Sequence, residues 1–429
     1  MAKQASQINQ KIEFEMKRAL ILLALAGFIS CKNEPKIAEN NIKEDVAYLA
    51  DDKLEGRQTG TQGEVLASEY LIERFKAIGV QPKGTEGYLQ SFSFKPKTDP
   101  HSEVEFTTNA DSTITGHNVI GFIDNNAKTT IVIGAHYDHL GYGGEGSLFR
   151  GEEKAIHNGA DDNASGVAVM LNLASRLKVK NDQAEIKDTN NYLFMAFSGE
   201  EMGLLGSNYF SKNPTIDAES INYMINMDMV GRMKADSTLA VYGTGTSPMF
   251  KQTLKSNNDK FKIVENESGV GPSDHTSFYL IDIPVLHFFT GQHEDYHKPG
   301  DDSDKLNYDG MNLISDYIFD IITDLDDNGE LAFRKTKNES EETPRFKVGL
   351  GVVPDYLYDG KGMRIDGTRE DTPAYAAGLQ KGDVVLKLGD STITDMMSYM
   401  RALSVFDNGD EAGITVKRGE ETIDTKVQF

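Results

Sequence analysis

Five short segments of the chain carry side chains suited to metal-assisted chemistry, each at the end of a predicted strand. They are His136-Tyr137-Asp138, Gly159 to Asn163, Glu200-Glu201, Asn226-Met227-Asp228 and Tyr296-His297. Imidazole nitrogens and carboxylate oxygens are the ligands with which a pair of zinc ions activates a shared water. The sequence therefore predicts a binuclear metal centre and a hydrolytic reaction.

Alternating strands and helices are expected to position these segments. Apolar, β-branched runs predict strands at 118–123, 130–134, 192–197, 221–227 and 284–289. Helical patterns are found at 43–80, 164–178, 201–210, 246–257 and 309–326. This alternation predicts an α/β fold with a mostly parallel central sheet and helices on both faces. In such sheets ligands bind beyond the carboxyl ends of the strands, where the candidate residues fall.

His136 ends an apolar strand, and Asp138 follows two residues later. The Asp138 carboxylate could accept the second imidazole N–H, because a metal-bound histidine nearly always has such a partner. Asp161 lies in the small-residue loop Gly-Ala-Asp-Asp-Asn-Ala-Ser-Gly, and its two carboxylate oxygens could bridge two cations. Taken singly, a histidine after a strand is more often structural and an aspartate before a helix is more often an N-cap.

Glu200 and Glu201 are neighbours at the end of a third predicted strand. Adjacent residues there can point in different directions, so one can bind metal while the other remains free as a general base. Asp228 ends the next predicted strand, and His297 lies in the loop Tyr-His-Lys-Pro-Gly-Asp-Asp. Together with His136 and Asp161, these residues could supply the ligands for two ions.

As a set, these motifs resemble the co-catalytic zinc aminopeptidases of the family that also contains glutamate carboxypeptidase, glutaminyl cyclase and the transferrin receptor. The resemblance covers roughly residues 45–325 and rests on six motifs, at 135–141, 158–166, 199–207, 226–229, 273–278 and 296–299. It implies a zinc exopeptidase fold of the phosphorylase/hydrolase-like kind. It also implies a metallo-aminopeptidase that hydrolyses N-terminal residues from peptide substrates.

The resemblance implies a role for each site residue and two Zn²⁺ ions per chain. His136 and Asp228 would hold one zinc, Glu201 and His297 the other, and Asp161 would bridge them beside a cis peptide bond to Asp162. Glu200 would be the general base and Asp138 the partner of His136. Tyr296 is a candidate donor to the developing oxyanion, with ordinary packing as the open alternative. Asp274 and His275 are expected to line the substrate pocket, and histidines 101, 117, 139, 157, 287 and 293 are predicted to be structural.

Two other functions are open at this stage. A glutaminyl cyclase-like enzyme would share the fold but use one zinc, which disagrees with five filled ligand positions. A non-catalytic peptide-binding relative would lack ligands or the base, whereas every position is filled in this sequence.

The C-terminal residues predict a second domain. The segment 327–344 is charged and poor in apolar residues, so it is expected to be a linker after a peptidase domain at 32–326. Residues 345–429 resemble a PDZ domain through Gly349-Leu350-Gly351-Val352 and the segment 372–383. The first loop could bind a peptide C-terminus with its backbone N–H groups, while packing on the catalytic domain is the alternative.

The N-terminus predicts export. Lys17 and Arg18 precede an apolar run at 19–29, and Cys31, the only cysteine, follows it. Residues 1–31 therefore predict a signal peptide, either an ordinary one or a bacterial lipoprotein signal whose cysteine is lipidated. The second form would anchor the protein in the cell envelope, in the periplasm or at the outer membrane. Whether translation begins at Met1 or Met16 is open.

The charge balance disfavours one class of partner. With 44 basic and 67 acidic residues the chain carries a formal charge of −23 and a sequence pI near 4.8. Such a surface repels phosphate backbones, so nucleic-acid binding is not expected.

Overall fold

The computed structural model describes most of the chain beyond its N-terminal segment. The described residues are 41–96, 105–107, 113–144, 146–151, 153–184, 189–326, 328–336, 347–355, 358, 360–369 and 371–429. The predicted signal peptide, its Cys31 and much of the predicted linker lie outside them. Among the described residues, no helix combines the length and apolar character needed to cross a bilayer.

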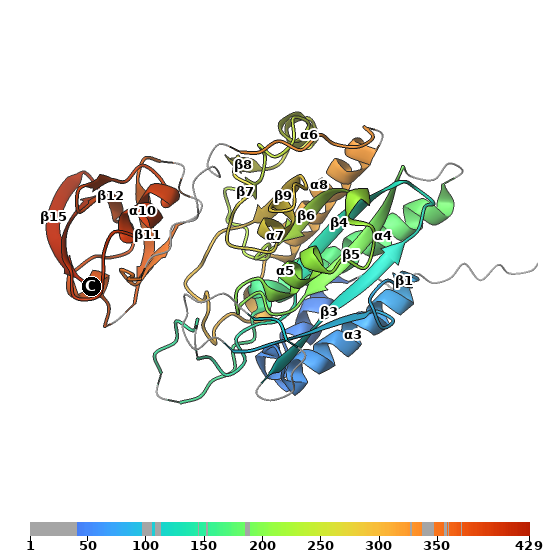
Figure 1. The fold of residues 1–429 in the computed structure, drawn as a ribbon, viewed down its shortest axis with the longest axis horizontal. Helices are drawn as coiled ribbons and strands as arrows, with labels where there is room; N and C mark the ends of the chain where they lie inside the picture. Colours follow the sequence, from blue (N-terminus) through green and yellow to red (C-terminus); the bar gives the residue numbers. More distant parts are fainter. Residues whose placement is uncertain are drawn as a thin grey trace, which may run out of the picture. The chain divides into compact units, whose positions relative to one another are not determined.

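Nine strands of the described residues form one sheet (Figure 1). They are β1 (Gln81–Pro82), β2 (Leu89–Phe94), β3 (Ile114–Ile123), β4 (Thr129–His136), β5 (Asn190–Phe197), β6 (Ile221–Met227), β7 (Thr238–Tyr242), β8 (Lys262–Asn266) and β9 (Val285–Phe289). Their order is β1-β3-β5-β4-β6-β9-β7-β8, with β2 also paired to β3. The four central strands β5, β4, β6 and β9 run parallel, whereas β3 and β7 flank them in antiparallel register.

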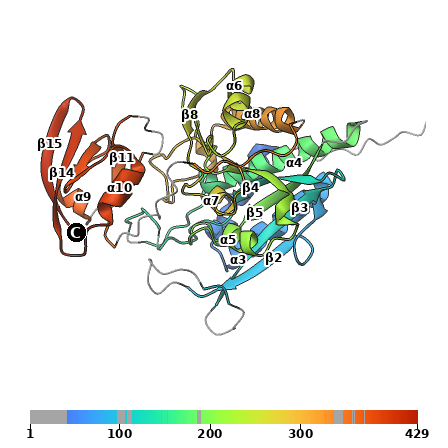
Figure 2. The ribbon, with the colours of Figure 1, turned by 45° about the horizontal axis from the view of Figure 1, so that its top comes forward.

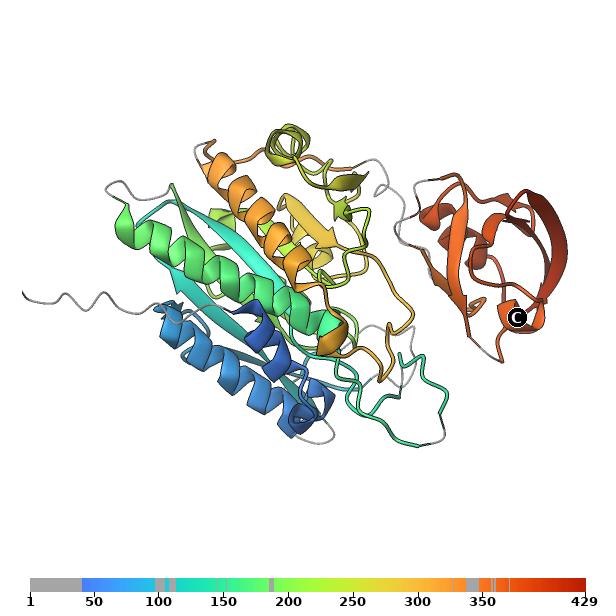
Figure 3. The same ribbon diagram turned by 180° about the vertical axis from the view of Figure 1, so that it is seen from behind.

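Helices cover both faces of this sheet, as the alternating pattern predicts. Figure 3 shows α2 (Ile42–Leu49), α3 (Gln62–Ile78), α4 (Gly166–Gln183) and α8 (Tyr308–Asp326) on one face. The helix α6 (Phe250–Asn257) packs beside α8, and α5 (Leu205–Lys212) and α7 (His275–Tyr279) cover the opposite face (Figure 2). The α/β class inferred from sequence is therefore confirmed, and its parallel part is the centre of the sheet.

The alternation of side chains along β4 explains the two-sided core. Ile131 and Ile133 belong to the apolar cluster under α4 and α8, while Val132 belongs to the cluster under α5 and α7. Because helices cover both faces, every residue of β5 and β6 is buried. This rigid centre carries the ends of four strands to one edge of the sheet.

The C-terminal residues form a second, mostly β module with a hydrophobic core of its own. Its elements are β10 (Val352–Pro354), β11 (Met363–Thr368), α9 (Pro373–Ala376), β12 (Val384–Leu388), β13 (Ser391–Thr392), α10 (Met396–Leu403), β14 (Glu411–Arg418) and β15 (Glu421–Gln428). The strands pair antiparallel in the order β10-β11-β12-β14-β15, and β13 pairs with β12.

Candidate metal centre and active site

The predicted site residues converge at the carboxyl ends of the parallel strands. His136 is the last residue of β4, and Asp228 directly follows β6. Glu200 and Glu201 lie in the turn after β5, and His297 lies in the loop after β9. Because these four strands are neighbours in the sheet, their ends meet at one edge, as expected for ligand sites in parallel sheets.

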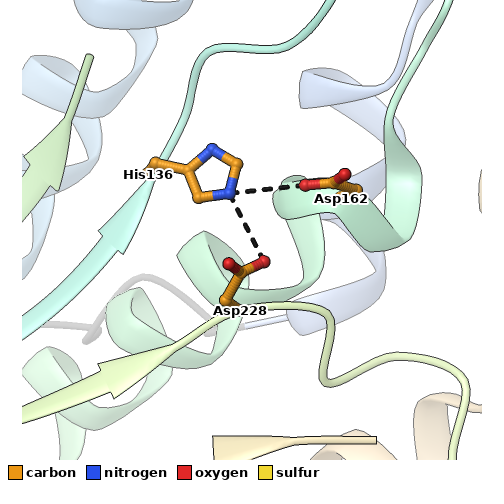
Figure 4. A group of neighbouring side chains, drawn as sticks. All are labelled: His136, Asp162 and Asp228. Carbon is orange, nitrogen blue, oxygen red and sulfur yellow. Dashed lines mark hydrogen bonds and ion pairs between the residues drawn. The ribbon is translucent and has the colours of Figure 1, made fainter. Parts of the chain in front are cut away.

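A first group forms around the imidazole of His136 (Figure 4). Its Nε2 lies 3.3 Å from Oδ1 of Asp228 and 3.3 Å from Oδ1 of Asp162. Its Nδ1 lies 3.2 Å from the backbone oxygen of Asp138 and 3.7 Å from a carboxylate oxygen of the same residue. The Nδ1–H is thereby directed away from the group, which leaves Nε2 available as a ligand.

A second group forms around His297. Its Nε2 lies 3.2 Å from Oδ2 of Asp162 and 3.2 Å from Oε2 of Glu201. Its Nδ1 donates to the backbone oxygen of Gly146 at 2.8 Å, so Nε2 again faces the carboxylates. The two oxygens of Asp162 thus face different histidines, which is the arrangement a bridging ligand requires.

Asp162 lies between the two histidines, one residue after the predicted Asp161. Oδ1 of Asp161 instead accepts the backbone N–H of Gly231 at 2.6 Å, and its Oδ2 lies 3.2 Å from Nε2 of His293. The cis peptide bond correspondingly joins Asp162 and Asn163 rather than Asp161 and Asp162. The backbone N–H groups of both aspartates donate to the Asp301 carboxylate, at 2.9 and 3.0 Å, which helps set the direction in which each side chain points.

His139 was predicted to be structural, yet it belongs to the second group. Its Nδ1 lies 2.7 Å from Oε1 of Glu201 and 3.9 Å from Oδ2 of Asp162. Its imidazole and the carboxylates of Asp162 and Glu201 lie close enough together to hold one cation, as do His136, Asp162 and Asp228. The signal for it was the second histidine in His-Tyr-Asp-His, three residues after the first.

Sequence reasoning also missed Arg57, which supports the loop under the centre. Its fully buried guanidinium donates to the carbonyl oxygens of Tyr137, Asn158 and Gly159 at 2.7 to 3.0 Å, and to that of Leu49. Burial lowers the pKa of Arg57 to about 10, even though nearby carboxylates raise it. The side chain remains a cation at neutral pH and offsets part of the negative charge of the site.

The two adjacent glutamates have opposite electrostatic environments. Burial raises the pKa of Glu200 well above its usual range; the negative charges of Asp228 and Glu201 raise it further, and His136 opposes them. Burial also raises the pKa of Glu201, but the charges of His297 and His139 outweigh this effect and lower the pKa to about 2. Divergent pKa values of this kind suit one residue to proton transfer and the other to permanent ionisation. The Asp138 carboxylate accepts the Glu200 backbone N–H at 3.1 Å, which ties the base to the His136 loop.

A cavity opens directly on these carboxylates. Its walls are formed by Asp162, Glu200, Glu201, Asp228, Met229, Tyr242, Pro272, His287, Phe289, Gln292, Tyr296 and His297. The Tyr296 ring stacks on that of His297 with centroids 3.9 Å apart. Asp274 and His275, expected to line the pocket, lie fully buried behind this wall, where the His275 ring stacks on His287 at 4.4 Å.

The donor atoms at this edge suit zinc. Both groups combine imidazole nitrogens with carboxylate oxygens, the mixture found in catalytic zinc sites. The imidazoles are buried or nearly so. The second nitrogens of His136 and His297 bond to backbone oxygens, which fixes the orientations of these two rings. Buried carboxylates in such proximity repel one another, and a bound divalent cation would relieve that repulsion.

Comparison with known proteins finds a family model that matches part of the chain in each domain. The profile of "Peptidase family M28" matches residues 118–322, and that of "PDZ domain" matches residues 333–429. A protein of Trichophyton verrucosum named "Probable leucine aminopeptidase" is 33% identical over 178 residues, which are 39% of this chain and 44% of the relative. This chain therefore spans less than half the length of that relative.

Solved structures share the fold. An aminopeptidase from Aneurinibacillus sp. strain AM-1 aligns with a TM-score of 0.51 and 18% identity, over 69% of this chain and 94% of that one. The glutaminyl cyclase of Porphyromonas gingivalis aligns with a TM-score of 0.51 and 16% identity, over 66% of this chain and 97% of that one. At these identities the alignments establish the common architecture and do not distinguish between the two chemistries.

Proposed function

We propose that this chain, whose residues 118–322 form a domain of peptidase family M28, is a zinc-dependent aminopeptidase that removes N-terminal residues from peptides. The observation that carries the proposal is the position of Asp162 between two histidines. Its Oδ1 lies 3.3 Å from His136 and its Oδ2 lies 3.2 Å from His297.

Two zinc ions per chain are proposed for this centre. His136 and Asp228 would hold one, Glu201 and His297 the other, and Asp162 would contact both. Bound zinc at such a site lowers the pKa of an attacking water and polarises the scissile carbonyl. The presence of two groups of metal-binding side chains favours a two-zinc hydrolase over a one-zinc glutaminyl cyclase.

Glu200 is proposed as the general base. It lines the cavity, and its raised pKa suits a group that accepts a proton from water and later returns it to the leaving amine. Asp138 would hold His136 and the Glu200 backbone in place. Tyr296 would donate its hydroxyl hydrogen to the oxygen of the scissile carbonyl as negative charge develops on it. The support for this role is that Tyr296 lines the cavity beside His297.

The cavity favours a free amino terminus and an apolar first side chain. Four carboxylates, those of Asp162, Glu200, Glu201 and Asp228, lie on its wall. Three of them would hold zinc, which leaves the Glu200 carboxylate to attract an α-ammonium group. Met229, Tyr242 and Phe289 form the apolar part of the same wall and belong to one buried cluster. The relative named as a leucine aminopeptidase fits this preference.

Hydrolysis of a matched substrate panel tests the function. Leucyl- and phenylalanyl-4-nitroanilide should be cleaved, lysyl- and aspartyl-4-nitroanilide poorly, and N-acetyl-leucyl-4-nitroanilide not at all. Removal of zinc by a chelator should abolish cleavage and added zinc should restore it. Cleavage that is unaffected by chelation, or equal cleavage of the acetylated compound, would refute the proposal.

The PDZ domain is proposed to bind peptide C-termini. The support is the glycine-containing loop Gly349-Leu350-Gly351, which leads directly into β10, a strand at the edge of its sheet. Such an edge can accept a peptide as an additional strand, while successive backbone N–H groups bind the carboxylate. Fluorescent peptides that differ only in a free or amidated C-terminus test this, since amidation should abolish binding.

Export and lipid anchoring through Cys31 are proposed from the N-terminal residues alone. The support is the order of basic residues, apolar run and cysteine. Expression in a bacterium, with labelling by a palmitate analogue and membrane fractionation, tests the proposal. Cys31→Ser should lose the label and leave the membrane fraction, whereas an unlabelled wild type would refute lipidation.

A further inference from the structure

The two carboxylate oxygens of Glu201 have different partners, and His139 is one of them. Oε1 lies 2.7 Å from Nδ1 of His139, a normal hydrogen-bond distance, while Oε2 lies 3.2 Å from Nε2 of His297. The separation of 3.9 Å between His139 and Asp162 is too long for a hydrogen bond. The Nδ1–H of His139 is thus committed to a single oxygen of Glu201.

The surroundings of His139 fix its ring in this position. The side chain is 1% exposed, and its ring meets that of His297 edge to face with centroids 5.8 Å apart. Gly159 packs against the other side, where a Cβ atom would lie 2.5 Å from the His139 ring. Any larger residue at Gly159 would displace the imidazole. The ring therefore cannot rotate without moving the loop that carries the bridging aspartate.

We propose that His139 is a positioning residue for the second metal group: its Nδ1–H holds Oε1 of Glu201, so that only Oε2 is presented to the zinc beside His297 and Asp162. This inference rests on the proposed zinc-dependent function. It predicts an asymmetric centre, because His136 and Asp228 have no contact of this kind with His139 among the described residues. Loss of an orienting hydrogen bond commonly weakens a metal site about 10- to 100-fold.

Zinc titration of three variants tests the inference. His139→Ala removes the donor, whereas His139→Asn places an amide N–H near the position of Nδ1 and should rescue it. His117→Ala is the matched control, because His117 lies on β3 and pairs with Glu64 instead. Each metal-free protein is titrated with zinc against a competing chromophoric chelator, and folding is compared by thermal denaturation of the metal-free proteins.

The expected result is a loss of zinc affinity at only one of the two metal sites. In His139→Ala one of the two zinc dissociation constants should rise about 10- to 100-fold. Both constants should stay close to the wild-type values in His139→Asn and His117→Ala. Zinc-edge anomalous scattering at limiting zinc should then place the retained ion of His139→Ala beside His136 and Asp228.

Several results would overturn the inference. They are unchanged zinc affinity in His139→Ala, equal weakening of both sites, and a His139→Asn protein as defective as His139→Ala. If His139→Ala does not fold, His139→Gln replaces it, since its amide lies near the Nε2 position and should not rescue Glu201. A wild type that binds two zinc ions without cleaving peptides would refute the proposed function alone, because the titration would still decide the role of His139.

Discussion

The assignment of Asp162, rather than Asp161, as the proposed bridging ligand predicts opposite defects for these two adjacent aspartates. Asp162→Asn replaces one carboxylate oxygen with an amide nitrogen, so the side chain can no longer offer an anionic oxygen to both metal groups. Asp161→Asn leaves the metal groups intact. Instead, the substitution removes the negative charge of the Asp161 carboxylate, which accepts the Gly231 N–H at 2.6 Å and lies 3.2 Å from His293.

The expected magnitudes follow from these contacts. Asp162→Asn should reduce the zinc content from two ions to at most one per chain after dialysis and should lower kcat about a thousandfold or more, since metal ions contribute several kcal/mol to such reactions. Asp161→Asn should retain zinc but lose about 1 kcal/mol of unfolding free energy, roughly the difference between a hydrogen bond to a charged group and one to a neutral group.

Elemental analysis of dialysed protein and urea denaturation of the metal-free forms measure the two effects on the same preparations. The reasoning fails if the pattern is reversed, with zinc lost from Asp161→Asn and kept by Asp162→Asn. It also fails if both variants retain two ions and wild-type activity.

Three further outcomes are expected from the same structure. Glu200→Gln should lower kcat about 10²- to 10⁴-fold while the zinc content stays unchanged, because it removes only the base; normal turnover would exclude Glu200 from this role. Burial raises the pKa of Asp274 from 3.8 to about 7, so the folded, metal-free protein favours the protonated acid and loses stability as pH rises toward that value. Relative to Asp274→Asn, the wild type should lose about 2 kcal/mol of unfolding free energy between about pH 5.5 and about pH 8. If urea denaturation gives the wild type and the variant the same dependence of unfolding free energy on pH, the raised pKa of Asp274 is contradicted. Tyr242→Ala should reduce the preference for leucyl and phenylalanyl substrates over alanyl ones, measured as the ratio of kcat/KM values, and an unchanged ratio would remove Tyr242 from the specificity pocket.

The central architecture could be predicted because burial on both faces leaves a strong trace in the sequence. The runs that became β4, β5 and β6 are apolar and rich in β-branched or aromatic residues, so they stand out as strands. The short strands β7 and β8 were not predicted. None of the five residues of β8 is buried at this edge of the sheet, so its sequence lacks the apolar run that marks the central strands.

Helix boundaries near the site were less predictable for a local reason. The helix expected from 201 begins only at Leu205. Residues 199–204 form a turn in which Gly199 and Leu204 have left-handed backbone conformations. This turn directs Glu200 and Glu201 to different partners, and side-chain hydrophobicity contains no information about it.

The residues of the candidate metal centre were predictable by residue type, whereas the choice between neighbouring residues was not. His136, Asp138, Glu200, Glu201, Asp228 and His297 lie where the motifs placed them, around one edge of the sheet. Asp161 and Asp162 differ only in tertiary contacts: Asp161 meets Gly231 and His293. Asp162 instead faces His136 and His297. The proposed role of His139 depends in the same way on a distant partner, Glu201.

The most direct test of the binuclear centre is zinc-edge anomalous diffraction from crystals grown with zinc. Two peaks should appear about 3.5–4 Å apart, one between His136 and Asp228 and the other between Glu201 and His297, with Asp162 in contact with both. A single peak, or peaks bound to Asp161 rather than Asp162, would contradict the proposed centre.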